Sequence, residues 1–590
     1  MEARNQQFTR AQFEELRTRQ LGRLAALKTQ QFGYRGLWRD LADFVDPTLH
    51  RFLVTDRNRT NQNLRNSKIL NSTATQARDT LAYGLMSGIT NPAQPWFQFK
   101  ASDPSLNTQR SVKVYLDLIR ERIADVFLRS NLYTQLPQTY ANLGTFATDS
   151  FELVRDDKTT VRCYSHPIGS YFLDIDGRMA VDTNYRQFQM TVAAVVERYG
   201  LSNVCESTKR AYEQGNYSNW ITITKAIEPN RHFDAAKLDA SRKKWLSTTW
   251  EEGSAPTEYL RVSGFDSFPV MAPRWQAVGE DVYGSSCPAM RALGDILQLQ
   301  AETKRKGELV ELHNKPPLAA PTSLKGKPMS SLPGGLTFLD ITQMGQGIAP
   351  IYQPSLPGMQ YLLEDIAAIS MRIDKAFYKD LFLMFADMTG TNRTATEIAA
   401  RQEEKLLALG PVYMRQNDEL LDPLVNRTFQ IMVDQSLPYW GGMLNGDPML
   451  PPPPPELVNA DLTIEYISPM AQAMRSVGIT SIERAVTFAG SMAQAFPEVL
   501  DNIAADKVYT RYYDMVGAPA DGLVDEEQRD QIRAQKQQQM AAQQAMQAGV
   551  AGASAAKDLS QASLSDDNAL SQLMGRLQGQ PAPAPYPQGA

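Results

Sequence analysis

The chain has 590 residues, of which 43% are hydrophobic and 21% charged, and its formal net charge is −5 at pH 7. This composition is typical of a folded soluble protein of several domains, since a single core rarely grows past about 250–300 residues. It excludes a protein that coats nucleic acid over its whole surface, although a local basic stripe stays possible. No apolar run approaches the roughly 20 residues that cross a bilayer, and the N-terminus lacks a signal-peptide pattern. We therefore expect no membrane partner and a cytoplasm-like place of synthesis.

The first 144 residues follow a helical pattern. Apolar residues recur at near-helical spacing over 5–50, and Asp46-Pro47 ends that run. The same spacing predicts helices over 67–86, from Asp103-Pro104 onward, and over 133–144.

The period then changes to short alternating runs, so 145–280 is predicted to be a mixed α+β region. Asp176-Gly177 is a hairpin signal between two of the runs. We expect strands at 151–154, 160–164, 171–178, 221–224, 258–262 and 268–273, and helices at 192–199 and 203–214.

The central part reads as helix, insert, helix, hinge and long helix. Helices are predicted over 288–313 and 359–382, separated by a Pro/Gly-rich insert that cannot continue a helix. A polar hinge at 387–394 follows, and Thr394 with Glu397 has the spacing of a capping box for a helix that begins at Ala395. Prolines 411 and 423 predict a kink at each position. This order describes a rod-like body rather than a pocket.

The C-terminal part begins with a polyproline spacer at 451–455 and a strand at 462–467. Residues 470–516 are predicted to be helical. From 525 onward the composition shifts to Gln and Ala, which is consistent with one exposed helix to about residue 548 or with disorder.

Motifs for chemistry are absent from the sequence. There is no Walker A motif, no HExxH and no metal-ligand spacing among the three cysteines, which are expected to be buried. Ser165 and His166 are adjacent on a predicted strand and would point to opposite faces. We expect no enzyme, no cofactor and no metal.

Basic residues on the two central helices allow two interpretations. Arg372, Lys375 and Lys379 lie at i, i+3 and i+7, so one face of the second helix would carry three positive charges. They form either a solvated mixed-charge surface or a row that faces phosphates through charge alone. The same alternatives apply to Lys304 and Lys306 in the first helix and to Lys325 and Lys327 in the insert, where docking of a protein is a third possibility.

Two stretches carry a family resemblance. Residues 64–97, which include Leu81-Ala-Tyr-Gly-Leu-Met-Ser-Gly-Ile-Thr-Asn-Pro, resemble the N-terminal signature of head-to-tail connector (portal) proteins of short-tailed, podovirus-type bacteriophages. Residues 388–401, Met-Thr-Gly-Thr-Asn-Arg-Thr-Ala-Thr-Glu-Ile-Ala-Ala-Arg, are similar to the junction of tunnel loop and helix in that family. The resemblance spans roughly residues 10–520 and implies a mainly α fold with an α+β wing, in a subunit of a closed ring.

The resemblance also implies names for the segments. They are an N-terminal wing region (1–286, with its α+β part at about 145–280), a first stem helix (287–313), a clip (314–357), a second stem helix (358–382), a tunnel loop (383–394), a long wing helix with C-terminal wing or crown (395–520), and a crown or barrel helix with a flexible tail (521–590).

Function follows from the same resemblance. Portals are rings, usually of twelve subunits, at one capsid vertex of the virion, and are assembled in the host cytoplasm. Double-stranded DNA passes through the channel without sequence specificity. The implied partners are the terminase large subunit, tail adaptor and nozzle proteins, and the major capsid and scaffolding proteins. The candidates for the DNA channel are Thr389, Asn392, Arg393, Arg372, Lys375, Lys379, Lys304 and Lys306, and those for docking at the clip are Lys325 and Lys327.

Two other functions remain open from the sequence. One is a different structural protein of the virion, such as an internal core or minor capsid component without a DNA channel. The other is a hydrolase that would use Ser165 and His166.

Overall fold

A computed structural model describes most of the chain between residues 9 and 543. The chain divides into two compact units, 1–518 and 519–590, which are described separately. The hinge at 387–394, the start of the long helix at Ala395 and nearly all of the clip lie outside the described residues. Those described are 9–54, 68–237, 239–315, 318–319, 349–350, 356–386, 409–440, 448–458, 460–493, 502–516 and 528–543, with 496, 498, 524 and 546.

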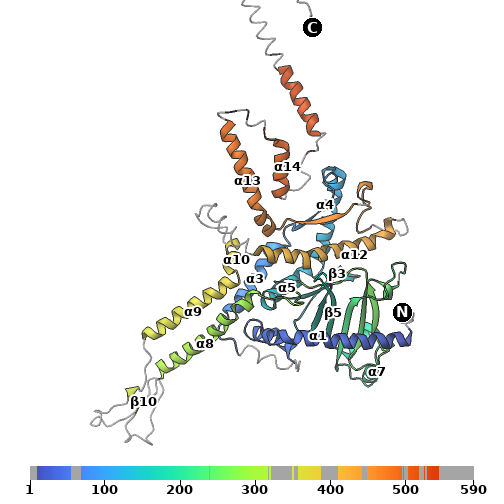
Figure 1. The fold of residues 1–590 in the computed structure, drawn as a ribbon, viewed down its shortest axis with the longest axis vertical. Helices are drawn as coiled ribbons and strands as arrows, with labels where there is room; N and C mark the ends of the chain where they lie inside the picture. The colour runs from blue at the N-terminus through green and yellow to red at the C-terminus, as the bar shows by residue number, and fades with distance from the viewer. Residues whose placement is uncertain are drawn as a thin grey trace, which may run out of the picture. The chain divides into compact units, whose positions relative to one another are not determined.

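The chain opens with a long helix, α1 (Arg10–Phe44), as predicted (Figure 1). Thr9 and Gln12 form a capping box at its start. At its end Asp46 accepts from the backbone N–H of Thr48 and so begins a 3₁₀ turn, η2 (Pro47–Leu49). A short helix, α2 (His50–Leu53), follows directly.

The predicted α+β region contains a five-stranded antiparallel sheet. The predicted hairpin at Asp176-Gly177 is confirmed, because the backbone N–H of Asp176 donates to the carbonyl of Ala180 at 2.8 Å. Two helices, α6 (Val192–Tyr199) and α7 (Glu206–Glu213), lie in the connection between the second and third strands. In sheet order the strands are β4 (Tyr171–Ile175), β5 (Val181–Thr191), β6 (Trp220–Pro229), β7 (Trp245–Glu251) and β8 (Arg261–Phe265).

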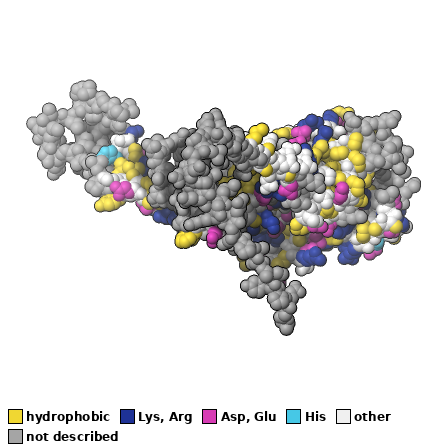
Figure 2. Space-filling model, turned by 90° about the horizontal axis from the view of Figure 1, so that it is seen from above, with side chains coloured by type: hydrophobic (Ala, Val, Ile, Leu, Met, Phe, Trp, Pro, Cys, Tyr) yellow, Lys and Arg dark blue, Asp and Glu magenta, His cyan; other side chains and the backbone are white. Residues whose placement is uncertain are grey.

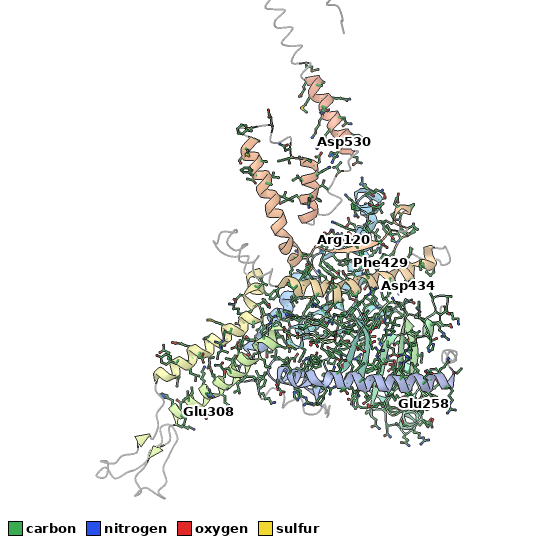
Figure 3. The ribbon with its side chains drawn as sticks, in the orientation of Figure 1. Arg120, Glu258, Glu308, Phe429, Asp434 and Asp530 are labelled. Atoms are coloured by element: carbon green, nitrogen blue, oxygen red, sulfur yellow. The ribbon has the colours of Figure 1, made fainter. Side chains whose placement is uncertain are left out.

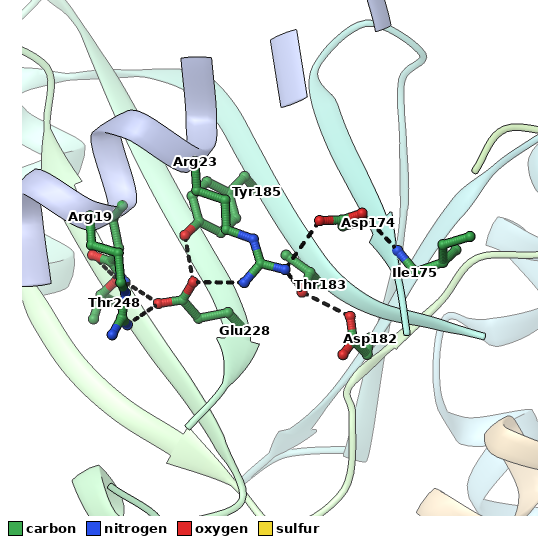
Figure 4. Close-up of polar contacts among 10 residues, drawn as sticks. Arg19, Arg23, Asp174, Ile175, Asp182, Thr183, Tyr185, Glu228 and Thr248 are labelled. Carbon is green, nitrogen blue, oxygen red and sulfur yellow. Dashed lines mark hydrogen bonds and ion pairs between the residues drawn. The ribbon is translucent and has the colours of Figure 1, made fainter. Parts of the chain in front are cut away.

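Helix α1 lies across this sheet and is held there by a buried carboxylate (Figure 4). Glu228 of β6 accepts from Arg19 at 2.7 Å and from the hydroxyl of Tyr185 at 2.7 Å, and it pairs with Arg23 at 3.4 Å. Arg23 also reaches Asp174 of β4 at 3.1 Å. Each charge in this network has a partner of opposite sign, so the buried carboxylate of Glu228 is not an unpaired charge.

A second, three-stranded sheet has the order β3–β2–β9, from Thr160–His166, Ser150–Asp156 and Val270–Met271. Its edge strand β3 is capped by a side chain. Asn131 donates to the carbonyl of Cys163 at 2.7 Å and accepts from the N–H of Cys163 at 2.8 Å. The side-chain amide takes the place of a neighbouring strand, which closes an edge that would otherwise pair with another chain.

Two helices pack beside this sheet, α4 (Arg110–Arg129) and α5 (Leu132–Phe146), and α3 (Thr73–Ile89) packs on α5. The helix predicted from Asp103-Pro104 begins only at Arg110, because a turn held by Asp103 and a 3₁₀ turn, η4 (Leu106–Thr108), come first.

A strand that the sequence did not indicate, β1 (Phe97–Ala101), pairs antiparallel with the predicted strand β12 (Leu462–Tyr466). Phe429 of the next long helix is labelled in Figure 3, and its ring centroid lies 5.7 Å from that of Phe99 in β1.

The C-terminal part of the first unit is helical. A helix over 409–416 passes through a π-turn, Asn417–Leu421, into α12 (Asp422–Trp440). Helices α13 (Pro469–Ala493) and α14 (Ala505–Val516) follow, and 528–543 is helical in the second unit. No helix within the described ranges is long and apolar enough to cross a membrane.

Candidate functional site

The two central helices run antiparallel and side by side (Figure 1). They are α8 (Pro288–Asn314), which confirms the helix predicted over 288–313, and α9 (Leu356–Ala376). Arg372 of α9 donates to Asp295 of α8 at 3.0 Å. This ion pair shows which parts of the two helices lie side by side.

The helix pair is buried at one end. In α8 the buried residues lie between Pro288 and Glu302, and in α9 the fully buried ones are Ile369 and Ile373. At the other end Val310 is 38% exposed and Tyr361 of α9 is 72% exposed. Large apolar side chains in water favour contact with a further surface, so the outer half of the pair is suited to meeting another molecule.

The second central helix is interrupted, contrary to the single helix predicted over 359–382. Helix α9 ends at Ala376, Tyr378 has a positive φ of 57°, and a new helix, α10 (Lys379–Ala386), begins. The predicted row of three cations on one face is therefore wrong. Lys379 starts a different helix and pairs with Asp374 at 2.9 Å.

Helix α10 is held against α3 by a close contact at a glycine. A Cβ atom on Gly84 would lie 2.2 Å from the ring of Phe382. Gly84 belongs to the Leu81–Pro92 stretch of the N-terminal signature, so the structure gives this glycine a packing role. Leu381 and Phe382 of α10 are both buried there.

The candidate cations divide into paired and exposed residues. Arg372 and Lys379 are occupied in ion pairs with Asp295 and Asp374. Lys304 lies 4.0 Å from Glu308, and both side chains are mostly exposed to solvent, where such a pair is weak. Lys375 is exposed and Lys306 half-exposed, and neither has a carboxylate within ion-pair distance among the described residues.

Two exposed arginines of α8 were missed by the sequence reasoning. Arg291 and Arg305 have no carboxylate within ion-pair distance among the residues that the structure covers. They are about four helical turns apart, so they lie on the same side of α8, and this spacing is the signal that could have found them. Figure 2 shows basic and acidic side chains interspersed over the face in view, which fits the mixed-charge interpretation of most of the surface.

The helix beyond the hinge is anchored at its π-turn. Arg274 donates to Glu419 from its backbone N–H at 2.7 Å and from its side-chain Nη2 at 2.6 Å. Gln416 donates back to the carbonyl of Arg274 at 3.1 Å. The hinge candidates Thr389, Asn392 and Arg393 and the clip candidates Lys325 and Lys327 lie outside the described residues.

Ser165 and His166 contact different carboxylates. Ser165 donates to Asp149 at 3.1 Å, whereas His166 Nε2 lies 3.2 Å from Glu152, which Lys225 also contacts. Burial raises the pKa of Asp149 to about 6 and, together with nearby charges, lowers that of His166 to about 4. The side chains of Ser165 and His166 point to different partners, as predicted for neighbours on a strand. The two residues therefore do not form a nucleophile–base pair.

The cysteines are buried, as expected. Cys163, Cys205 and Cys287 are all free thiols. Burial raises the pKa of Cys163 and Cys287 to about 12, so both stay protonated. No group of three or more His, Cys, Asp or Glu suited to a metal ion occurs within the described part of the chain.

Comparison with known proteins gives a match over nearly the whole chain. The family model of the bacteriophage head to tail connecting protein matches residues 17–524. The chain is 41% identical over 560 residues to the portal protein of Salmonella phage epsilon15, covering 95% of this chain and 98% of the relative. It is 38% identical over 560 residues to a probable portal protein of Bordetella phage BPP-1, with the same coverage of both chains.

Proposed function

Because this chain belongs to the bacteriophage head to tail connecting protein family, we propose that it is a portal protein, a structural subunit of the phage particle at the junction of head and tail. The observation that carries the proposal is the match over 95% of the chain to two portal relatives. The subunit assembles into a closed ring, usually of twelve copies, at one vertex of the capsid. DNA is packaged and ejected through the ring.

The helix pair α8–α9 supports a ring. Its outer half leaves Val310, Tyr361 and Leu363 exposed at 38%, 72% and 42%. Apolar surface of this kind gains about 25 cal/mol per Å² when it is covered. In a cyclic assembly of identical chains every subunit covers its neighbour in the same way, so no copy is left with an open face.

We assign the segments of the subunit accordingly. Helices α8 and α9 form the stem, the insert at 314–357 forms the clip, and 383–394 forms the tunnel loop. The clip, with Lys325 and Lys327, docks the terminase large subunit and later the tail adaptor and nozzle proteins. The wing meets the major capsid and scaffolding proteins during assembly in the host cytoplasm.

DNA passage needs charge without base recognition. Lys375 and Arg291 are exposed cations one helical turn from the Arg372–Asp295 pair on their respective helices. In a ring each becomes a circle of positive charges that attracts phosphates of any sequence. The tunnel-loop residues Thr389, Asn392 and Arg393 add a second contact with the DNA.

The test is the assembly state of the purified full-length chain. Electron microscopy of negatively stained particles, together with native mass spectrometry, should show closed rings with a central hole and one defined copy number. A chain that forms no closed ring would instead support a structural virion protein without a channel.

A further inference from the structure

Helix α1 carries an excess of cations that the chain only partly neutralises. Between Leu16 and Arg39 it has six Lys or Arg and no Asp or Glu. Arg19 and Arg23 are occupied by Glu228. The guanidinium of Arg17 lies 4.6 Å from the centroid of the Trp250 ring and 4.3 Å from that of Tyr259.

Arg35 and Arg39, one turn apart, contact neutral groups, unlike Arg19 and Arg23. Arg35 donates to the neutral Gln31 Oε1 at 3.2 and 3.3 Å, and Arg39 donates to the carbonyl of Leu53 at 3.1 Å. Among the described residues no carboxylate lies within ion-pair distance of either arginine. Burial and the charge of Arg39 lower the pKa of Arg35, as expected for a guanidinium beside a like charge.

One exposed aromatic side chain lies on the same face of α1 as these arginines. Phe32 is 74% exposed and precedes Arg35 and Arg39 by about one and two helical turns. Gly36, one turn after Phe32, has open space where a Cβ atom would be. Aromatic residues and arginines are enriched at protein interfaces, so this face has the composition of an interface rather than of a solvated helix.

Helix α9 presents the complementary surface. Tyr361 is 72% exposed. Glu364 and Asp365, one turn after it on the same face, are exposed carboxylates. Glu364 accepts from the neutral Gln360 at 3.1 Å, and neither carboxylate has a cation within ion-pair distance in the described part of the chain. A face with an exposed aromatic ring and two unpaired acids thus matches a face with an exposed aromatic ring and two unpaired arginines.

The α1 surface and the α9 surface lie at similar positions along the length of the α8–α9 helix pair. Since Arg372 is paired with Asp295, Asp365, two turns earlier on α9, lies alongside the part of α8 two turns after Asp295. Gln300 of that part of α8 accepts from the backbone N–H groups of Leu70 and Asn71 at 2.7 and 2.9 Å.

The same segment leads back to the end of α1. Lys68 pairs with Asp43 of α1 at 2.6 Å, and Asp43 is one turn after Arg39. A copy rotated about an axis along the helix pair would therefore bring its α9 surface to the level of the α1 surface of its neighbour.

We propose that the α1 surface (Phe32, Arg35 and Arg39) docks on the α9 surface (Tyr361, Glu364 and Asp365) of the next copy of this chain. The arginines pair with the two carboxylates, and the two aromatic rings cover one another. This inference rests on the ring of the proposed function and names the faces that build it. The contact is heterologous, since two different surfaces meet, which is the geometry that closes a ring.

The test is a charge swap in the full-length chain. The double variant Arg35→Glu/Arg39→Glu and the double variant Glu364→Arg/Asp365→Arg each place like charges opposite one another. Each should raise the protein concentration needed for half-maximal ring assembly at least about ten-fold at low salt, and less at high salt. The quadruple variant should restore assembly, because the charges are then exchanged but complementary.

The control is Glu15→Arg, which changes a charge on the exposed side of the first turns of α1 and should leave assembly unchanged. Thermal unfolding of each variant confirms that the subunit itself is folded. Assembly that the double variants do not weaken, or that the quadruple variant does not restore, would overturn the inference while the portal function stands. A wild-type chain that stays monomeric would overturn the ring itself, and this contact with it.

Discussion

Arg274 binds Glu419 with its backbone N–H at 2.7 Å and with its Nε and Nη2 atoms at 3.1 and 2.6 Å. The arginine side chain is 4% exposed, and the glutamate belongs to the π-turn that leads into α12. One carboxylate therefore ties the start of α12 to the segment after β9.

Glu419→Gln should strongly destabilise the subunit. The change leaves the buried Arg274 guanidinium without a counter-charge, which typically costs about 3–5 kcal/mol of unfolding free energy. Arg415 contacts the same carboxylate at 3.2 Å but is 34% exposed, so Arg415→Gln should cost less than about 1 kcal/mol. Urea unfolding of both variants compares the two costs, and equal midpoints would contradict the buried role of Arg274.

Gly84→Ala should displace α10. The new methyl group would lie 2.2 Å from the Phe382 ring and 2.7 Å from its Cβ atom, so turning the ring does not relieve the clash. Overpacking of this kind costs about 1–3 kcal/mol. The matched control is Gly88→Ala on the same helix, where the nearest atom is 3.6 Å away. That variant should be neutral or more stable, by up to about 1 kcal/mol from helix propensity. Thermal unfolding midpoints measure both, and similar midpoints would count against the contact.

The buried groups of the three-stranded sheet should give opposing pH dependences. The pKa of His166 is lowered from 6.5 to about 4. Its contribution to the free energy of unfolding is therefore present above pH 6.5 and is lost as the pH falls toward 4. The pKa of Asp149 is raised from 3.8 to about 6, so its contribution is present below 3.8 and is lost as the pH rises through 6. Each is worth about 3 kcal/mol, and the two nearly cancel between pH 4 and 6.5.

Removing either group should reveal the pH dependence that the other group gives to the stability. Relative to wild type, His166→Gln should become more stable toward pH 4, whereas Asp149→Asn should become more stable toward pH 6.5. Unfolding midpoints at several pH values across this window check the signs. Parallel profiles for the two variants would exclude the assigned protonation states.

Arg291→Gln/Lys375→Gln should weaken DNA binding by the assembled ring without weakening assembly. The slope of log affinity against log salt should become shallower by about 0.9 for each phosphate that the variant no longer binds. The weakening should be the same for any DNA sequence, and binding at several salt concentrations measures the slope. Lys379→Gln is the control, because that lysine is paired with Asp374 at 2.9 Å and only 24% exposed, so its loss should change the slope little. An unchanged slope in the double variant would remove these two residues from the channel.

Changes in the tunnel loop should separate packaging from assembly. Replacement of Arg393, or a shorter segment between Thr389 and Asn392, should reduce DNA packaging or retention while closed rings still form. The measurement is the length of the genome in particles that carry the variant. Particles with a full-length genome would argue against a role for the loop.

Local patterns predicted elements that lie within one stretch of chain. The helix over 192–199 and the long helix α8 agree with their predicted bounds within a residue, because periodicity and capping residues act over a few turns. The strand β1 was missed, since its partner β12 lies more than 350 residues away and supplies the pairing that makes five residues a strand.

The family, the α+β region and the first central helix were determined by the sequence alone, because they depend on local period and on two recognisable stretches. Only the tertiary structure decided the break at Tyr378, where Phe377 and Phe382 both enter the core and Phe382 packs on Gly84. The tertiary structure also decided which of the candidate cations have a carboxylate partner. Arg372 and Lys375 look alike in sequence, but the position of Asp295 on another helix neutralises the first and leaves the second exposed. Long-range packing and charge pairing depend on residues that are distant in the chain, and no local pattern records them.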